Sequence, residues 1–317
     1  MRDDLMVKVI FWKDIFLDWG VIIACFILMA HIESLWIDIA AIIIIGIEQY
    51  RLAILFHDLG HGTIFKKRKH NLIAANLLVG WWIGIDIAGF NRFHLSHHAN
   101  LNSKKDIELR EGKGNPLARG INRWTLPMSK KKVAFWFLFE IVFGPLLYLL
   151  LYIGFKVRFN DDGTQIFCWR ECVGTTILMA TVSLILWKFD LLWVFWVWLL
   201  ALGFVFYAFF NLRIVFEHLG CAKGETIPMS EPVKWYEWLY AITSGAHNIR
   251  YHVEHHYNAT VPYMLLPQKR KENLESGMKT IDLNAVLTLL STSPAIDSGE
   301  PLEKTDDRSF IYRMNKI

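Results

Sequence analysis

The sequence predicts an all-α integral membrane protein with four transmembrane helices in two hairpins, an interfacial or re-entrant helix, and a cytosolic cap rich in histidine. Two observations predict this fold class. Of the 317 residues, 54% are hydrophobic and 20% are charged, and the mean hydropathy is +0.29. Soluble globular proteins have about 45–50% apolar and about 25% charged residues. In addition, the apolar residues gather into runs long enough to cross a bilayer.

The first hairpin is predicted from two apolar runs near the N-terminus. Residues 16–30 precede a polar turn at 31–34, and residues 35–56 form a second run of 22 residues. A crossing needs about 20 residues of helix, which span about 30 Å. Within the second run, Glu48 and Arg51 predict an ion pair at positions i and i+3, and a polar contact for a substrate head group is the alternative.

The second hairpin is predicted from residues 173–212, which are apolar apart from Lys188, Asp190 and a few small polar residues. Forty helical residues would extend about 60 Å, twice the thickness of the hydrocarbon layer, so a turn is expected near Lys188. Residues 133–155 are also long enough to cross, but they contain Glu140 and Pro145. Histidine clusters lie on both sides of this stretch and can meet only across an even number of crossings. We therefore expect it to be interfacial or re-entrant.

The distribution of basic residues predicts the orientation. Residues 57–132 contain fourteen Lys or Arg, whereas the turn at 31–38 contains none, so the histidine clusters and both termini are expected on the cytosolic side. The basic run at 66–69 is typical of a topology signal or of a contact with anionic lipid, and nucleic-acid binding is not expected. We expect residues 1–270 to form the membrane domain with its cap. Residues 271–317 are expected to form a polar cytosolic tail, with one amphipathic stretch at 283–290.

The histidines carry the chemistry. Nine of the twelve gather in three clusters or at position 218, whereas the four cysteines are scattered, which excludes a disulfide framework and a cysteine-type zinc ribbon. The first cluster has the spacing HxxxH, and the other two share the spacing HxxHH. On a helix, positions i, i+3 and i+4 lie on one face. The candidate metal ligands are His57, His61, His94, His97, His98, His218, His252, His255 and His256.

The number of imidazoles indicates two metal ions. Neutral imidazole binds iron, zinc, copper and nickel well and binds magnesium or calcium poorly. A zinc site uses three or four protein ligands, so nine histidines exceed one mononuclear site. Two ions with about five or six ligands each would leave positions for water or dioxygen, which favours redox-active iron.

Together these motifs resemble the membrane fatty acid desaturase and hydroxylase superfamily. Three further features are similar to those of the family. They are the segment from Asn102 to Asp106, the element Arg213, Glu217 and His218, and the prolines Pro262 and Pro267 after the third box. The resemblance implies that the nine histidines bind two iron ions (Fe2+/Fe3+). These ions would take electrons from a separate donor, reduce dioxygen and remove hydrogen from an unactivated C–H bond. Ala259 stands where the family often has proline, and Ile214 where acyl-CoA desaturases place an asparagine, so the substrate class stays open.

A metal-bound histidine usually donates its second N–H to a carboxylate or a carbonyl. The candidates for such supporting roles are Asp58, Asp106, Glu217 and Glu254, with His247 and Asn248 one helical turn before the third box. Solvated acids or helix caps are the alternatives for the carboxylates. The tryptophans at 81, 82, 193, 196 and 198 are expected to be interfacial or packing residues.

The sequence therefore predicts a dioxygen-dependent desaturase of a lipid or acyl substrate. Its expected electron donor is a separate protein, such as a ferredoxin or a b-type cytochrome with its reductase, because the sequence contains no His-Pro-Gly-Gly haem signature. The alternative is a hydroxylase or ketolase of a lipid, a carotenoid or a small amphiphile on the same scaffold. A more remote alternative is a metal-binding membrane transporter, for which the ligands should lie at midplane depth within broken helices.

Overall fold

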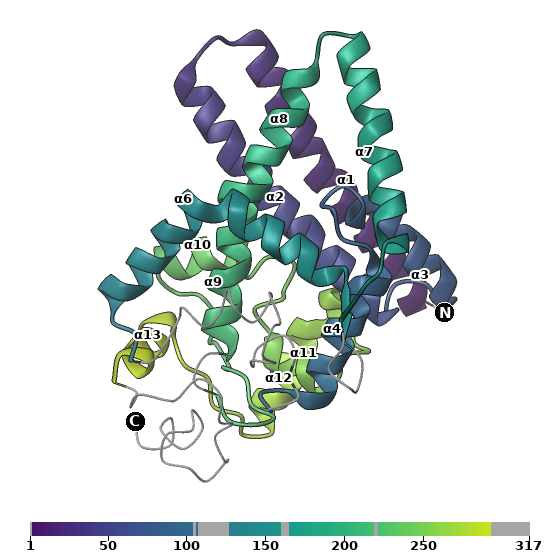
Figure 1. Ribbon diagram of the computed structural model, residues 1–317. Helices are drawn as coiled ribbons and strands as arrows, with labels where there is room; N and C mark the ends of the chain where they lie inside the picture. The colour runs from purple at the N-terminus through teal and green to yellow at the C-terminus, as the bar shows by residue number, and fades with distance from the viewer. Residues whose placement is uncertain (1, 104–105, 107–126, 160–164, 219–220, 293–317) are drawn as a thin grey trace. The chain divides into compact units, whose positions relative to one another are not determined.

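The computed structural model of the protein describes residues 2–103, 106, 127–159, 165–218 and 221–292 (Figure 1). These residues are mainly helical, and the strands among them are the short antiparallel pair β1 (Val157–Phe159) and β2 (Gln165–Phe167). The chain divides into two compact units. The first unit combines Met1–Phe90 with Glu140–Phe209, and the second combines Asn91–Phe139 with Phe210–Ile317.

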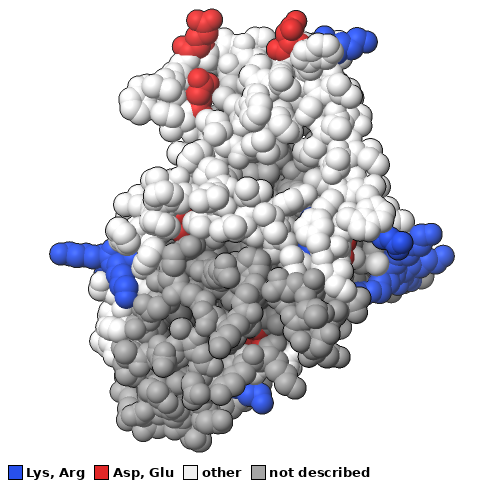
Figure 2. All heavy atoms as spheres, viewed as in Figure 1, with Lys and Arg blue, Asp and Glu red and all other residues white. Residues whose placement is uncertain are grey.

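Two helical hairpins dominate the first unit. Helices α1 (Arg2–His31) and α2 (Leu35–His61) form one, and α7 (Arg170–Lys188) and α8 (Leu192–Leu200) form the other. The predicted turn near Lys188 is confirmed, and Asp190 adopts a left-handed φ of 57° there. Both hairpin turns lie at one end of this unit (Figure 1). Figure 2 shows mainly acidic side chains at that end and a group of basic side chains beside α3 at the opposite end.

Five helices within the described residues are long and apolar enough to cross a membrane. They are Asp4–His31, Leu35–His61, Lys130–Phe155, Arg170–Lys188 and Leu192–His218. The last comprises α8, the π-helical turn η2 (Ala201–Phe206) and α9 (Tyr207–His218). The third is α6 (Lys130–Phe155), the stretch for which the sequence predicts an interfacial position. The apolar composition and the predicted helices at both hairpins are thus confirmed, whereas the number of true crossings stays a prediction.

Close backbone approaches pack the helices of the first unit. Gly144 of α6 faces the carbonyl oxygen of Gly203 in η2, and a Cβ atom at either glycine would collide with the other helix. Gly46 of α2 lies in the same way against Val205 and the carbonyl of Ala201. Glycine is needed at these positions because the approach leaves no room for a side chain.

A buried polar cluster joins the first two helices. Arg51 of α2 lies 3.0 Å from Glu48, which is the predicted i, i+3 pair, and its guanidinium also donates to Asp18 of α1 at 3.1 Å. Asp18 is only 1% exposed. The cluster ties α1 to α2 with one cation between two carboxylates. The sequence pattern of α2 alone does not reveal Asp18 as a partner of Arg51.

The segment after α2 is more ordered than the sequence indicates. It forms α3 (Arg68–Ala75) and the π-helical turn η1 (Asn76–Gly80). Its tryptophans are packing residues, as expected: the Trp198 indole donates to the carbonyl of Trp82 at 2.9 Å and stacks on Trp19 with ring centroids 5.5 Å apart. These contacts fix the segment against α1 and α8.

The second unit consists mainly of short helices. Apart from the ends of longer ones, these are α10 (Trp235–Ile242), α11 (His252–Tyr257), η3 (Tyr263–Leu265), α12 (Leu266–Glu275) and α13 (Leu283–Thr292), while α4 (Ile87–Asn100) enters this unit at Asn91. The predicted amphipathic stretch at 283–290 is confirmed as α13, whose Val286, Leu289 and Leu290 are buried beside Phe216.

The expected boundary between the membrane domain and the tail falls inside a helix. Residue 270 lies in the middle of α12, and α13 contributes to the core of the second unit. The chain therefore continues its packed structure to residue 292. Residues 293–317 of the expected tail lie outside the described residues.

Candidate metal centre

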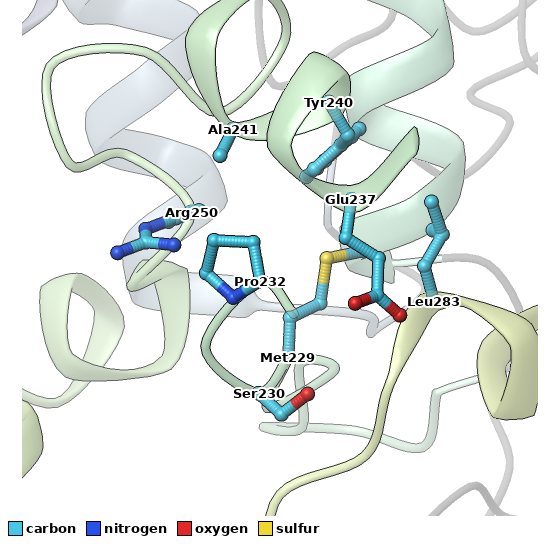
Figure 3. A pocket seen from close by; sticks show the side chains of 8 residues that line it. All are labelled: Met229, Ser230, Pro232, Glu237, Tyr240, Ala241, Arg250 and Leu283. Carbon is cyan, nitrogen blue, oxygen red and sulfur yellow. The ribbon is translucent and has the colours of Figure 1, made fainter. Parts of the chain in front are cut away.

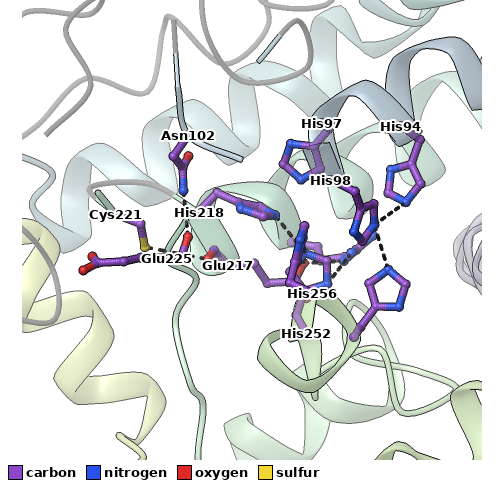
Figure 4. A network of polar contacts seen from close by, with 12 residues as sticks. His94, His97, His98, Asn102, Glu217, His218, Cys221, Glu225, His252 and His256 are labelled. Atoms are coloured by element: carbon purple, nitrogen blue, oxygen red, sulfur yellow. Dashed lines mark hydrogen bonds and ion pairs between the residues drawn. The ribbon is translucent and has the colours of Figure 1, made fainter. Parts of the chain in front are cut away.

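The third histidine box lies on α11, as its HxxHH spacing predicts. His252 and His255 are buried, with exposed fractions of 1% and 0%. The Nε2 atoms of His252 and His256 lie 2.9 Å apart, one helical turn from each other. The helical spacing i, i+3 and i+4 places the three imidazoles of this box on one side of α11, and Figure 4 shows His252 and His256 close to His218.

His218, at the end of α9, meets this box. Its Nε2 lies 2.8 Å from the Nε2 of His252. Directly before His218 in α9, Glu217 lies 3.4 Å from the Nε2 of His252 and is held at 2.6 Å by Arg213, and the Nη2 of Arg213 reaches the Nδ1 of His252 at 3.1 Å. Glu217 approaches His252 at Nε2, the nitrogen that also faces His218, whereas Arg213 faces Nδ1, so the predicted role of Glu217 as the acceptor of a second N–H stays a prediction.

The second box contributes His97 from α4. The Nδ1 of His97 lies 2.8 Å from the Oδ2 of Asp106, a carboxylate that is fully buried. When His97 donates from Nδ1, its Nε2 carries the lone pair that can coordinate a metal. Ligand atoms of four histidines from three helices of the second unit, His97, His218, His252 and His256, lie within 4.8 Å of one another.

A second group of imidazoles lies in the same unit. The Nε2 of His98 is 3.0 Å from the Nε2 of His94 and 3.0 Å from the Nε2 of His255. Box two therefore sends His97 to one group and His94 and His98 to the other. Box three divides in the same way, with His255 in this second group.

The first box lies in the first unit. His57 and His61 are in the last turns of α2, with ring centroids 4.8 Å apart, so the prediction of one shared helical face is confirmed. Asp58 accepts a hydrogen bond from Thr63 Oγ1 and lies 3.5 Å from His57 Nδ1. That distance is longer than a hydrogen bond, so Asp58 adjoins His57 without clearly orienting it.

Three further predicted residues face other partners. Glu254 lies on the opposite side of α11 from the imidazoles, and both of its oxygens bind Arg270 at 2.7 Å. Asn248 donates to the carbonyl of Tyr263 at 3.3 Å, and the ring of His247 packs edge-on against Tyr263. Glu254 therefore contacts α12 from the side of α11 opposite the imidazoles, and both of its oxygens accept hydrogen bonds from Arg270. The role of His247 and Asn248 toward His252 stays a prediction.

Several supporting residues escaped the sequence analysis. Asn102 adopts a left-handed φ of 53°, donates its backbone N–H to Asp106 and donates its side chain to the carbonyl of Glu225 at 2.7 Å. Arg270 and Asn273 of α12 both bind Glu254. The place of Asn102 after the second box was a signal, whereas Arg270 sits in a stretch read simply as polar.

The donor atoms suit a transition metal. Four pairs of Nε2 atoms lie 2.8–3.0 Å apart. Two imidazole lone pairs at this distance repel unless a proton or a cation lies between them. Neighbouring imidazole ligands of one metal, with bonds of about 2.1 Å, lie about 3 Å apart. An all-nitrogen, buried donor set of this kind fits iron and its neighbours in the transition series and not magnesium or calcium.

Burial also selects the protonation state that binds metal. Loss of hydration lowers the pKa of His252 and His256 well below the usual 6.5, and the neighbouring histidines and Arg213 lower it further. Both imidazoles are therefore neutral at physiological pH, which is the form that can coordinate a cation.

The family model described as "Fatty acid desaturase" matches residues 34–282. The matched range covers most of the chain and includes all nine candidate ligands and the supporting residues Asp106, Glu217 and Arg270.

Proposed function

The chain belongs to the fatty acid desaturase family, and from that premise we propose that it is a membrane-bound di-iron oxidoreductase that introduces a double bond into an acyl chain. The family and the helices long enough to cross a membrane establish an oxidoreductase-type, membrane-embedded protein. The observation that carries the specific proposal is the convergence of buried, neutral imidazoles from α4, α9 and α11.

We propose two ligand groups for two iron ions. His97, His218, His252 and His256 would hold one ion, and His94, His98 and His255 would hold the other. On the pattern of the family, His57 and His61 would add two ligands to the second group. When bound, the irons would supply the reduction of dioxygen and the removal of hydrogen from an unactivated C–H bond.

The residues around the imidazoles would hold their orientation. The Asp106 carboxylate holds His97 through Nδ1, and the ion pair of Arg213 and Glu217 contacts His252. These groups are buried, which excludes bulk water from the imidazoles and keeps His252 and His256 unprotonated. The protein thus fixes ligand position and protonation before any substrate arrives.

The overall reaction needs an external source of electrons. Desaturation removes two hydrogens from the chain, and with dioxygen, two electrons and two protons it yields two waters. A ferredoxin, or a b-type cytochrome with its reductase, would supply the electrons. Hydroxylation of a lipid, carotenoid or small amphiphile uses the same two electrons and one dioxygen but leaves one oxygen atom on the product and yields one water. Ketolation needs two such rounds at the same carbon, followed by loss of water.

We also propose four crossings, with α6 in the interface. In support, the part of α6 in the first unit runs across the direction of α7 and α8 (Figure 1), and α6 contains Pro145 and the buried Glu140. With an even number of crossings, the histidine boxes and both termini would share the cytosolic side, where the basic run at 66–69 also favours them. Accessibility of single cysteines introduced at residues 33 and 190 tests this arrangement, since both turns should then react only from the non-cytosolic side.

Lipid and metabolite profiling tests the activity. Cells expressing the wild-type chain should gain a lipid that lacks two hydrogens, whereas cells expressing His97→Ala should not. Purified wild type should contain about two irons per chain. A product that gains one oxygen would replace desaturation by hydroxylation, and identical profiles from wild type and mutant would refute the oxygenase.

A further inference from the structure

We propose that Arg270 is a positioning residue for the third histidine box. It would hold α11 from the side opposite the imidazoles, so that His252, His255 and His256 keep their orientation. This proposal deepens the di-iron assignment and rests on it for its functional meaning. Its structural content, a clamp between α12 and α11, stands on contacts within the second unit alone.

Arg270 and Glu254 form an ion pair with two parallel hydrogen bonds. The Nε of Arg270 donates to Oε1 of Glu254, and an Nη2 donates to Oε2, both at 2.7 Å. This is a two-point contact between a planar guanidinium and a carboxylate, which fixes orientation as well as distance. Asn273, one turn further along α12, donates to Oε1 of Glu254 at 3.2 Å. Two side chains of α12 therefore hold one carboxylate of α11.

Glu254 lies at the centre of the ligand helix α11. Glu254 lies between His252 and His255 in sequence, so the bonds reach the ligand helix at its centre. α11 has only six residues, which is too short for a helix to be stable by itself. The imidazoles occupy one face and Glu254 the other. The orientation of the ligands therefore depends on contacts such as this one.

The guanidinium of Arg270 is buried and has further partners besides Glu254. Arg270 and Glu254 are each 2% exposed, so both charges are buried. Arg270 also donates to the carbonyl of Met229, and its guanidinium lies 5.0 Å from the centre of the Tyr251 ring. Met229 lines a small pocket together with residues such as Glu237 and Arg250, none of them a histidine (Figure 3). The Nε, Nη1 and Nη2 donors of Arg270 therefore all bind groups on the side of α11 opposite the imidazoles.

Residues next to the third box also bind the segments that surround α11. The hydroxyl of Tyr251, directly before the box, donates to Glu231 at 2.7 Å, and Arg250 pairs with the same carboxylate at 2.6 Å. Met229, in turn, pairs with Ile281 in an isolated bridge. The segment before α13 and the helix α12 therefore form one scaffold against which α11 is held.

Hydrogen exchange of the full-length, metal-free protein in detergent tests the clamp. Arg270→Met should leave Glu254 buried without a counter-charge, and amides 252–257 should exchange at least about tenfold faster than in wild type. Lys269→Gln is the matched control, because Lys269 pairs with Glu272 on the exposed side of the same helix. The control should exchange at the wild-type rate in this segment.

A second substitution separates the clamp from a general loss of structure in α12. In the double variant Arg270→Met with Glu254→Gln, the uncompensated charge is gone, so exchange in 252–257 should fall between wild type and Arg270→Met. Arg270→Lys should rescue only in part, since an ammonium cannot make the two-point contact. Wild-type exchange in Arg270→Met, or recovery to the wild-type rate in the double variant, would overturn the clamp, because the contact itself would then contribute nothing to the order of α11.

Iron content relates the clamp to the proposed function. Wild type and Lys269→Gln should load iron alike, and Arg270→Met should hold less iron per folded chain. If wild type loads iron and acts on lipid while Arg270→Met does the same with unchanged exchange, the positioning role is wrong and the proposed function stands. If wild type binds no iron yet the exchange pattern is as expected, the clamp stands and the di-iron proposal fails.

Discussion

The imidazole of His97 and the carboxylate of Asp106 form a buried pair, with Nδ1 and Oδ2 2.8 Å apart and side-chain exposures of 3% and 0%. Asp106 follows His97 by nine positions in the sequence, and the chain turns between them. Asn102 makes that turn, with a left-handed φ of 53° and a backbone N–H that donates to the same carboxylate oxygen. The pair therefore depends on the turn as much as on its own two residues.

Removing the Asp106 carboxylate should weaken metal binding. In Asp106→Ala, His97 loses the acceptor that fixes its Nδ1, and iron affinity should fall about 10–100-fold. Asp106→Asn keeps an acceptor but loses the charge, so its effect should be smaller. Titration with a competing chelator measures both. Glu275→Gln, an exposed change in the same unit, should leave the affinity unchanged, and an unaltered affinity in Asp106→Ala would contradict the role.

Two substitutions of Asn102 should separate backbone strain from hydrogen bonding. Asn102→Ala loses the hydrogen bond to the Glu225 carbonyl. It also places alanine, which rarely adopts the left-handed conformation, at a φ of 53°. Asn102→Gly loses the same bond but tolerates the conformation. The alanine variant should therefore be less stable than the glycine variant by about 1 kcal/mol. Thermal unfolding followed by circular dichroism tests this order, and a glycine variant less stable than the alanine variant would contradict it.

The approach of α6 to η2 predicts a contrast between two glycines. Gly144→Ala adds a methyl group against the Gly203 carbonyl, where the backbone cannot yield, and should destabilise the first unit by about 1–3 kcal/mol. Gly20→Ala lies in α1 with nothing within 4 Å of the new Cβ. It should be neutral or stabilising by up to about 1 kcal/mol. Thermal stability of both variants in one detergent checks the contrast.

The stability contributed by Asp282 should depend on pH. Its carboxylate accepts the backbone N–H of Ala285 at 2.7 Å at the start of α13, and Lys234 pairs with it. These contacts lower the pKa of Asp282 below 3.8, the bond from Ala285 having the largest effect. A lowered pKa stabilises the folded state above the unfolded pKa, and this contribution is lost as pH falls through the folded pKa.

Asp282→Ala should accordingly cost about 1 kcal/mol at neutral pH, the usual value for a lost helix cap. The difference in Tm between wild type and variant should shrink as the pH is lowered below the pKa of the folded state. Asp282→Asn, which keeps an acceptor without the charge, should show a smaller difference with little pH dependence. A difference that stays constant into acid would show that the charge of Asp282 is not involved.

The parts of the fold that follow from local pattern were predictable. The length of the apolar runs fixed the hairpins, and the need to turn within a 40-residue run placed the break near Lys188. The i, i+3, i+4 spacing placed the histidines of α4 and α11 on common faces, because a helical period leaves no other arrangement. His57 and His61 also lie on one helix, which continues from the apolar run to His61.

The partners of these residues were not predictable in the same way. Asp18 lies on a different helix from Arg51, and Arg270 follows Glu254 by 16 residues across a turn and a 3-10 helix. Neither pairing leaves a periodic trace in the sequence. The position of Glu254 beside the ligands predicts that it accepts an N–H from one of them, but helical geometry turns position i+2 away from i and i+3.

The support behind α11 also sets the smallest fragment that can work. A chain ended shortly after its last histidine, near residue 260, would keep every candidate ligand. It would lack Arg270 and Asn273, the two side chains that hold Glu254. Engineering that trims or fuses this protein at its C-terminal side should therefore place the junction beyond α13, since an intact set of ligands is not an intact site.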